Sequence, residues 1–233
     1  MEQFAITKRN GSLHVEGFPD AVRLIKLEDK KAQRISALLL HRHDLEFADE
    51  CLDAINSAPA EPPLVRSALW RCAIIHYAKC FGQSAARFPL AFEKIYKGEA
   101  PEAKLAFDYF KNLRDKHIVH DENAYSQSIP AAVLNGGNKT YKIEKIVSLA
   151  IHGETLEQAN YANLKLLIQW ALKWVASEFD TCCALVTKEL EAVPYEKLLE
   201  IEEVTVRVPT VEEISVNRSR QKEALTISSG GTL

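Results

Sequence analysis

Residues 63–81 have the sequence PLVRSALWRCAIIHYAKCF, and this stretch decides the fold class. Apolar side chains recur along it at helical spacing in two stripes, so nearly the whole circumference of the predicted helix is apolar. A helix of that kind usually lies at the centre of a bundle. Pro62-Pro63 opens it, because proline fits the first helical position, and Gly82 ends it. We therefore expect a mainly α protein built around this helix.

The segments on both sides of this stretch supply the other helices. Apolar residues repeat at helical spacing from about Asp29 to Asn56, through residues 101–119, and from Gly153 or Thr155 to about Leu190. A shorter helix is expected over residues 90–96. Long helices with short connections bury their apolar stripes most simply against one another. The sequence thus predicts a bundle of four to five helices.

Residues 129–151 differ in character from these helical segments. Two runs rich in β-branched residues flank Asn135-Gly136-Gly137-Asn138, which is typical of a tight turn between antiparallel strands. Tyr141, Ile143 and Val147 alternate with polar residues, as expected of a half-exposed strand. We therefore predict a β-hairpin insertion near residues 129–151.

These elements suggest three parts. Residues 1–28 form a β-like or irregular lead-in with a turn at Gly11-Ser12, and residues 29–193 form the helical domain. Residues 194–233 form a polar C-terminal extension. It contains a single strand over residues 204–208 and a partly disordered tail over residues 217–233.

The composition narrows the class of protein. A hydrophobic share of 47% is typical of a globular chain, and the net charge of −3 gives no overall basic field to attract nucleic acid. We find no secretory signal and no apolar run long enough to cross a bilayer. The five cysteines are an odd count, which favours reduced thiols. We therefore expect a cytoplasmic protein with no membrane contact, whose cysteines are small core residues.

Several catalytic motifs are missing from the sequence. It has no phosphate loop, dinucleotide glycine fingerprint, Gly-x-Ser-x-Gly or His-Glu-x-x-His, which argues against the common nucleotide hydrolases, dehydrogenases, serine hydrolases and zinc proteases. His41 and His43 would face different ways on a helix, so a solvated surface is favoured over a metal site. His76 is interpreted as a hydrogen-bonded core histidine. We expect no metal and no cofactor.

The segment with a chemical suggestion is residues 113–122, LRDKHIVHDE. On an ideal helix Arg114, His117 and Asp121 share a face, and His120 lies about a third of a turn from Arg114, so a bend would let them converge. An arginine fork can hold phosphate oxygens, and an imidazole titrates near neutral pH. These groups can cleave a phosphodiester without a metal. The alternative is a set of cations favoured at a helix C-terminus by the helix dipole.

Residues 113–122 resemble the signature of the HEPN superfamily (higher eukaryotes and prokaryotes nucleotide-binding domain). That signature has an arginine, a polar residue and then a histidine after a spacer of four to six residues. Arg114, Asp115 and His120 match it, with five residues between the arginine and the histidine. The surrounding segment is most similar to the abortive-infection branch, and the resemblance covers roughly residues 30–190.

This resemblance implies a metal-independent endoribonuclease (a hydrolase of the RNase type) that serves defence or a toxin-antitoxin system. His120 would act as general base or acid on the ribose 2′-hydroxyl and the leaving oxygen. Arg114 would stabilise the transition state, and Asp115 would orient one of them. Lys116 and His117 would contact substrate. The products would be a 2′,3′-cyclic phosphate (or its hydrolysed form) and a 5′-hydroxyl.

The resemblance also implies partners: a homodimer in which the motifs of two chains form a composite site, RNA as substrate, and an antitoxin or regulatory protein. Two alternatives stay open. One is a non-catalytic HEPN-like module that binds a partner protein, a nucleotide or RNA. The other is an unrelated helical adaptor in which the motif is accidental. The slight acidic charge suits these two somewhat better than a nuclease.

Overall fold

The computed structural model of the protein describes residues 6–9, 12–57, 62–205 and 209–216. The chain divides into two compact units. Unit 1 comprises Met1–Leu40, Gln83–Pro89 and Val175–Leu233, and unit 2 comprises His41–Gly82 and Leu90–Trp174.

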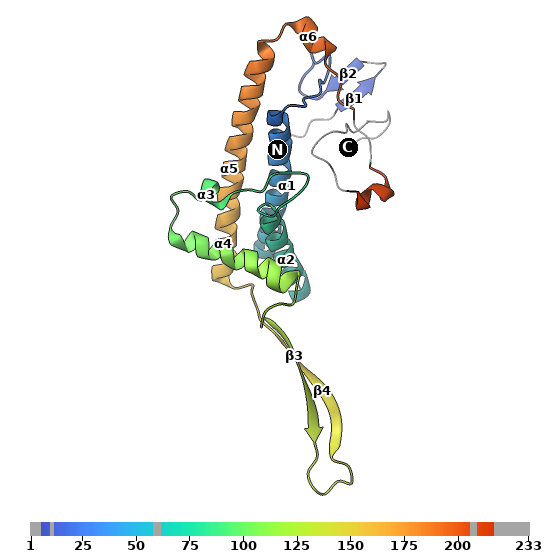
Figure 1. The fold of residues 1–233 in the computed structure, drawn as a ribbon, viewed down its shortest axis with the longest axis vertical. Helices are drawn as coiled ribbons and strands as arrows, with labels where there is room; N and C mark the ends of the chain where they lie inside the picture. The colour runs from blue at the N-terminus through green and yellow to red at the C-terminus, as the bar shows by residue number, and fades with distance from the viewer. Residues whose placement is uncertain (1–5, 10–11, 58–61, 206–208, 217–233) are drawn as a thin grey trace. The chain divides into compact units, whose positions relative to one another are not determined.

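Helices make up most of the described chain, and two short antiparallel hairpins accompany them (Figure 1). The predicted mainly α fold with a β-hairpin insertion is confirmed. In chain order the elements are β1 (Ile6–Arg9), β2 (Ser12–Val15), α1 (Lys30–Ser57), α2 (Pro63–Lys79), α3 (Phe92–Ile95), α4 (Pro101–Leu113), the π-helix η1 (Arg114–Ile118), β3 (Ser126–Leu134), β4 (Ile143–His152), α5 (Gln158–Glu191), α6 (Tyr195–Glu200) and the 3-10 helix η2 (Val211–Ser215).

The helix ends follow local chemistry that the sequence displays. The Asp29 carboxylate accepts the backbone N–H of Ala32 at 2.7 Å and so caps the first turn of α1. Proline stands at the start of both α2 and α4, where no backbone N–H is needed. Helix α2 ends at Lys79, slightly before the predicted end at Phe81.

The core of unit 2 forms where α2 meets α4, and α2 also packs against η1. Its large buried side chains include Trp70, Tyr77 and Phe110, with the Trp70 and Phe110 rings edge-on at 6.0 Å. The expectation that α2 is covered all round is wrong for its first two turns. Leu64 there is 80% exposed, so only the later turns of α2 lie in the core.

Several buried polar groups of unit 2 are hydrogen-bonded to one another. The Tyr96 hydroxyl donates to the backbone carbonyl of Leu167 at 2.8 Å and lies 2.9 Å from the Tyr77 hydroxyl. Because Tyr96 has one proton to give, Tyr77 is the donor between the two. Burial raises the pKa of both tyrosines. The indole N–H of Trp70 donates to Thr155 Oγ1 at 3.0 Å.

Within unit 1, residues 24–26 are hydrogen-bonded to residues 202–204. Strands β1 and β2 pair antiparallel within the segment predicted as a β-like or irregular lead-in, and residues 10–11 between them lie outside the described residues. Lys26 donates its backbone N–H to Glu202 at 2.8 Å, and Val204 donates to Leu24 at 2.9 Å. Of the predicted strand at residues 204–208, residues 206–208 lie outside the described chain, as does the predicted tail at residues 217–233.

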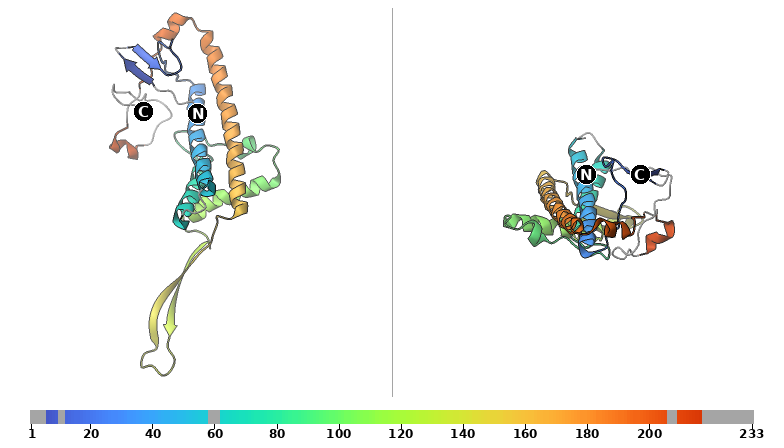
Figure 2. Two further views of the ribbon diagram at one scale, coloured as in Figure 1. Left: turned by 180° about the vertical axis from the view of Figure 1, so that it is seen from behind. Right: turned by 90° about the horizontal axis from the view of Figure 1, so that it is seen from above.

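Strands β3 and β4 pair antiparallel from Ser126↔His152 to Leu134↔Ile143, with a register irregularity after Val133. No residue of either strand is buried, so the expected half-exposed strand is wrong: both faces of this hairpin are exposed. In the view from behind, none of the helices of unit 2 lies against strands β3 and β4 (Figure 2, left). The alternation of apolar and polar residues along the sequence does not show whether a helix covers the apolar face of the hairpin.

Among the described residues, no helix combines the length and the apolar character needed to cross a membrane.

Candidate functional site

The predicted motif begins where α4 stops being an α-helix. The α-helix ends at Leu113, and Arg114–Ile118 continues as one π-helical turn. The Val119 N–H donates to the Arg114 carbonyl at 3.0 Å, the five-residue spacing that defines this wider turn. The sequence predicted a regular helix to Val119, so the faces assigned to Arg114, His117 and Asp121 do not hold. Such single π-turns are rare and often mark functional sites.

Arg114 and Asp115, which are neighbours in the sequence, form an ion pair within the π-turn. Nη1 of Arg114 lies 2.5 Å from Oδ1 of Asp115, and both side chains are about 40% exposed. A partly exposed ion pair of this kind contributes little to stability. Its effect is to hold the guanidinium in one orientation while leaving part of it open to solvent. Such a contact is compatible with the orienting role predicted for Asp115.

Two nitrogen atoms in the same turn are buried without a hydrogen-bond partner in the described chain: Nε of Arg114 and Nδ1 of His117. Buried polar atoms are normally paired, so an unpaired donor is informative. The His117 ring also contacts the Tyr125 ring, with centroids 5.7 Å apart. The turn therefore contains a buried guanidinium N–H without a partner and a half-buried imidazole.

His120 follows the π-turn and is exposed, as is Lys116. No described residue forms a hydrogen bond or ion pair with the His120 side chain. Nor does any such contact join Arg114 to His120. The structure thus brings together Arg114 and Asp115, and it leaves the imidazole of His120 accessible. The accessible imidazole is compatible with proton transfer to or from a substrate.

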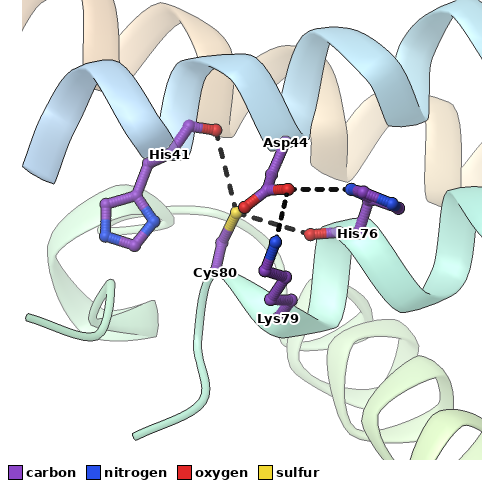
Figure 3. Close-up of polar contacts among 5 residues, drawn as sticks. All are labelled: His41, Asp44, His76, Lys79 and Cys80. Carbon is purple, nitrogen blue, oxygen red and sulfur yellow. Dashed lines mark hydrogen bonds and ion pairs between the residues drawn. The ribbon is translucent and has the colours of Figure 1, made fainter. Parts of the chain in front are cut away.

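A second polar cluster, which the sequence did not suggest, connects α1 with α2 (Figure 3). Oδ1 of Asp44 lies 2.8 Å from Nδ1 of His76 and 3.0 Å from Nζ of Lys79, and the Asp44 side chain is only 10% exposed. His76 and Lys79 stand three positions apart on α2, a spacing that puts them on one face. The only sequence signal was that spacing, and it did not identify a partner on α1.

Cys80 and His41 lie next to this cluster (Figure 3), and His43 follows two residues after His41 on α1. Cys80 is fully buried, and its thiol approaches the carbonyls of His41 at 3.8 Å and His76 at 3.5 Å, so it is not an exposed nucleophile. The interpretation of His76 as hydrogen-bonded agrees with its contact to Asp44. His43 is exposed as expected, but the expectation is wrong for His41, which is buried because residues two apart point to opposite sides of α1.

The Asp44 carboxylate therefore orients one imidazole and ties two helices together, with no open nucleophile beside it. Within the described ranges, no group of three or more His, Cys, Asp or Glu side chains is arranged to hold a metal ion. The π-turn with the residues after it is the better candidate site, because this segment combines a guanidinium paired with Asp115, a buried unpaired N–H and the accessible imidazole of His120.

Comparison with protein-family models, with curated proteins and with solved structures gives no match.

Proposed function

We propose that this protein is a metal-independent endoribonuclease whose site is the π-turn and the residues after it. The observation that carries the proposal is the oriented guanidinium of Arg114, with a buried N–H that no described residue satisfies. A phosphate group supplies the oxygen acceptors that such a guanidinium needs. The resemblance of residues 113–122 to the HEPN signature supports the same assignment.

In this proposal His120 accepts the proton of the ribose 2′-hydroxyl and later donates a proton to the leaving 5′-oxygen. Arg114 stabilises the charge on the phosphate oxygens in the transition state, and Asp115 holds Arg114 in place. Lys116 and His117 contact the phosphate backbone. A second copy of the chain completes the site, and a restraining partner protein would act by covering it.

The first test incubates the purified protein with end-labelled RNA in excess EDTA. We expect cleavage that leaves a 2′,3′-cyclic phosphate and a 5′-hydroxyl, and none at a position carrying a 2′-deoxyribose. Arg114→Ala and His120→Ala should each lower the rate by about 100-fold or more, the usual contribution of an electrostatic or acid–base group. Arg114→Lys should recover only part of the loss, because lysine has no bidentate fork.

The matched control is His43→Ala, which removes an exposed histidine of α1 outside the motif and should leave cleavage unchanged. A separate His117→Ala variant shows whether the imidazole within the π-turn shares the role of His120. Cleavage that survives both Arg114→Ala and His120→Ala in folded protein would show that the proposal is wrong. A protein that binds RNA tightly but never cuts it would instead support the non-catalytic alternative.

A further inference from the structure

The hydrogen bonds at the base of the β3–β4 hairpin fix which backbone groups face outward. Gly153 donates its N–H to the Tyr125 carbonyl at 2.7 Å, directly beyond the pair Ser126↔His152. In an antiparallel ladder, hydrogen-bonded pairs alternate with non-hydrogen-bonded pairs. Pairs an odd number of steps from Tyr125 and Gly153, such as Pro130↔Ser148, are therefore non-hydrogen-bonded. Their backbone groups point away from the partner strand, toward the outer edges.

The two outer edges of the hairpin are not equivalent. On β3, Pro130 occupies an outward position and has no N–H to offer, which is a common way to block an edge strand. On β4, residues 146–152 contain neither proline nor any Lys, Arg, Asp or Glu. The outward N–H and C=O groups of Ser148 and Ala150 thus form an unprotected edge. Edges of this kind pair readily with another strand.

The hairpin also has an apolar face that its own chain does not cover. Ile129, Leu149 and Ile151 lie on one face, since cross-strand partners and alternate residues point the same way, and each is about half exposed. An isolated two-stranded hairpin is only marginally stable in water. A third strand added to this ribbon would extend the apolar face and stabilise the pair.

Charge is distributed unevenly along the hairpin. The tip, residues 135–145, carries Lys139, Lys142 and Lys145 against a single acid, Glu144. The base has the opposite charge. Residues 119–128 and 152–158 contain no lysine or arginine and carry the acids Asp121, Glu122, Glu154 and Glu157. An antiparallel neighbour with the same sequence would place its basic tip beside this acidic base, and the arrangement would occur twice.

We propose that the free edge of β4 pairs antiparallel with β4 of a second copy of this chain. The result is a four-stranded sheet in the order β3-β4-β4-β3, related by a two-fold axis near Ser148 and Leu149. Both outer strands of that sheet are β3 strands with Pro130 at their edge, so assembly stops at the dimer. The proposal is independent of whether the protein cleaves RNA.

The test compares two alanine-to-proline variants of the full chain. Ala150→Pro removes an outward N–H from β4, whereas Ala132→Pro removes one from the edge of β3, which Pro130 already interrupts. Neither change removes a bond between β3 and β4. Mass is measured by analytical ultracentrifugation from about 1 to 100 µM, where a weak interface dissociates. We expect dimers for the wild type and Ala132→Pro, and monomers for Ala150→Pro.

A wild type that stays monomeric at the highest concentration overturns the proposal. So does an Ala150→Pro variant that dimerises as tightly as the wild type, or an equal loss in both variants. Hydrogen exchange of the wild type needs no variant: the amides of Ser148 and Ala150 should be protected at high concentration and exchange freely after dilution. Free exchange at high concentration also overturns it. Added salt should weaken the dimer, because the tip–base contacts are exposed.

Discussion

Tyr96 illustrates how one hydroxyl group can hold a buried region together. It accepts a hydrogen bond from Tyr77 and donates one to the Leu167 carbonyl, so it joins α2, the residue after α3, and α5 within unit 2. Both tyrosines are buried, and the Phe107 ring lies edge-on to Tyr77 at 6.4 Å. Removal of either oxygen therefore leaves a different set of groups without a partner.

The two tyrosine-to-phenylalanine variants should differ in stability. Tyr96→Phe leaves the buried Tyr77 proton without an acceptor, and we expect a loss of about 1–3 kcal/mol. Tyr77→Phe leaves only a lone pair of Tyr96 unused, and we expect about 0.5–1.5 kcal/mol. Urea unfolding followed by circular dichroism measures both. Equal losses, or a larger loss for Tyr77→Phe, would contradict the donor direction inferred for this pair.

The same tyrosines make stability fall in alkaline solution. Burial raises the pKa of Tyr77 above its ordinary value, and the unfolded chain ionises near pH 10. A raised folded pKa means that the contribution is complete below about pH 10 and is lost as pH rises toward the folded pKa. Between about pH 10 and the folded pKa, each such tyrosine lowers the free energy of unfolding by about 1.4 kcal/mol per pH unit.

Urea unfolding between pH 9 and about pH 11 measures this slope. Tyr77→Phe should reduce this slope by the contribution of one proton, about 1.4 kcal/mol per pH unit. Phe81→Leu, which changes a ring beside Tyr77 without removing a proton, is the control and should keep the wild-type slope. An unchanged slope in Tyr77→Phe would show that this phenol is not shielded in the folded state.

At the scale of single elements, the π-turn η1 contacts Tyr125 at the base of the hairpin. The Tyr125 ring contacts His117 of η1, and a Cβ on Gly153 would lie only 2.6 Å from Tyr125 Cδ1. Glycine is therefore required for this close approach at the base of β4. The ring of Tyr125 is the link between the hairpin and the π-turn, whereas the strands themselves contribute no buried residue.

Excision of the hairpin should therefore leave the helices folded. Residues 126–152 can be replaced by Asn-Gly, which joins Tyr125 and Gly153, already hydrogen-bonded to each other, in a two-residue turn. Measured on dilute monomer, we expect the free energy of unfolding to change by less than about 1 kcal/mol, as for other changes at exposed sites. The comparison is Trp70→Ala, a buried core change that should cost about 3–5 kcal/mol.

Loss of helical circular dichroism on excision would contradict this expectation. It would mean that the hairpin supports unit 2 through its base. If the helices stay folded and the dimer disappears, the hairpin is an element for association, which agrees with the pairing of β4 proposed above.

At the scale of the whole molecule, α1 and α5 each contribute residues to both units. Within unit 1 they are joined by Arg34 with Glu178 and by Lys31 with Glu189. Within unit 2, Lys165 of α5 lies 2.8 Å from Asp49 and 2.6 Å from Asp53 of α1. Burial lowers the pKa of Lys165, but hydrogen bonds to the two carboxylates outweigh it, so its pKa is raised.

The net charge of the whole chain does not show how charge varies from one part of the chain to another. A value of −3 argued mildly against contact with nucleic acid, yet the hairpin carries a basic tip, and Nε of Arg114 has no hydrogen-bond partner among the described residues. Function depends on these local fields, because exposed charges act over about 10 Å at moderate salt.

The sequence by itself determined the helices, the prolines that begin α2 and α4, the position of the hairpin and the place of the Arg114 motif. These features depend on periodicity and on backbone preferences that reach only about four residues along the chain. The tertiary structure alone decided that the motif begins on a π-turn, that Asp44 meets His76, that Tyr77 donates to Tyr96, and that both faces of the hairpin are exposed. Each of these depends on which distant side chains fill the space beside a residue, and no local pattern encodes that.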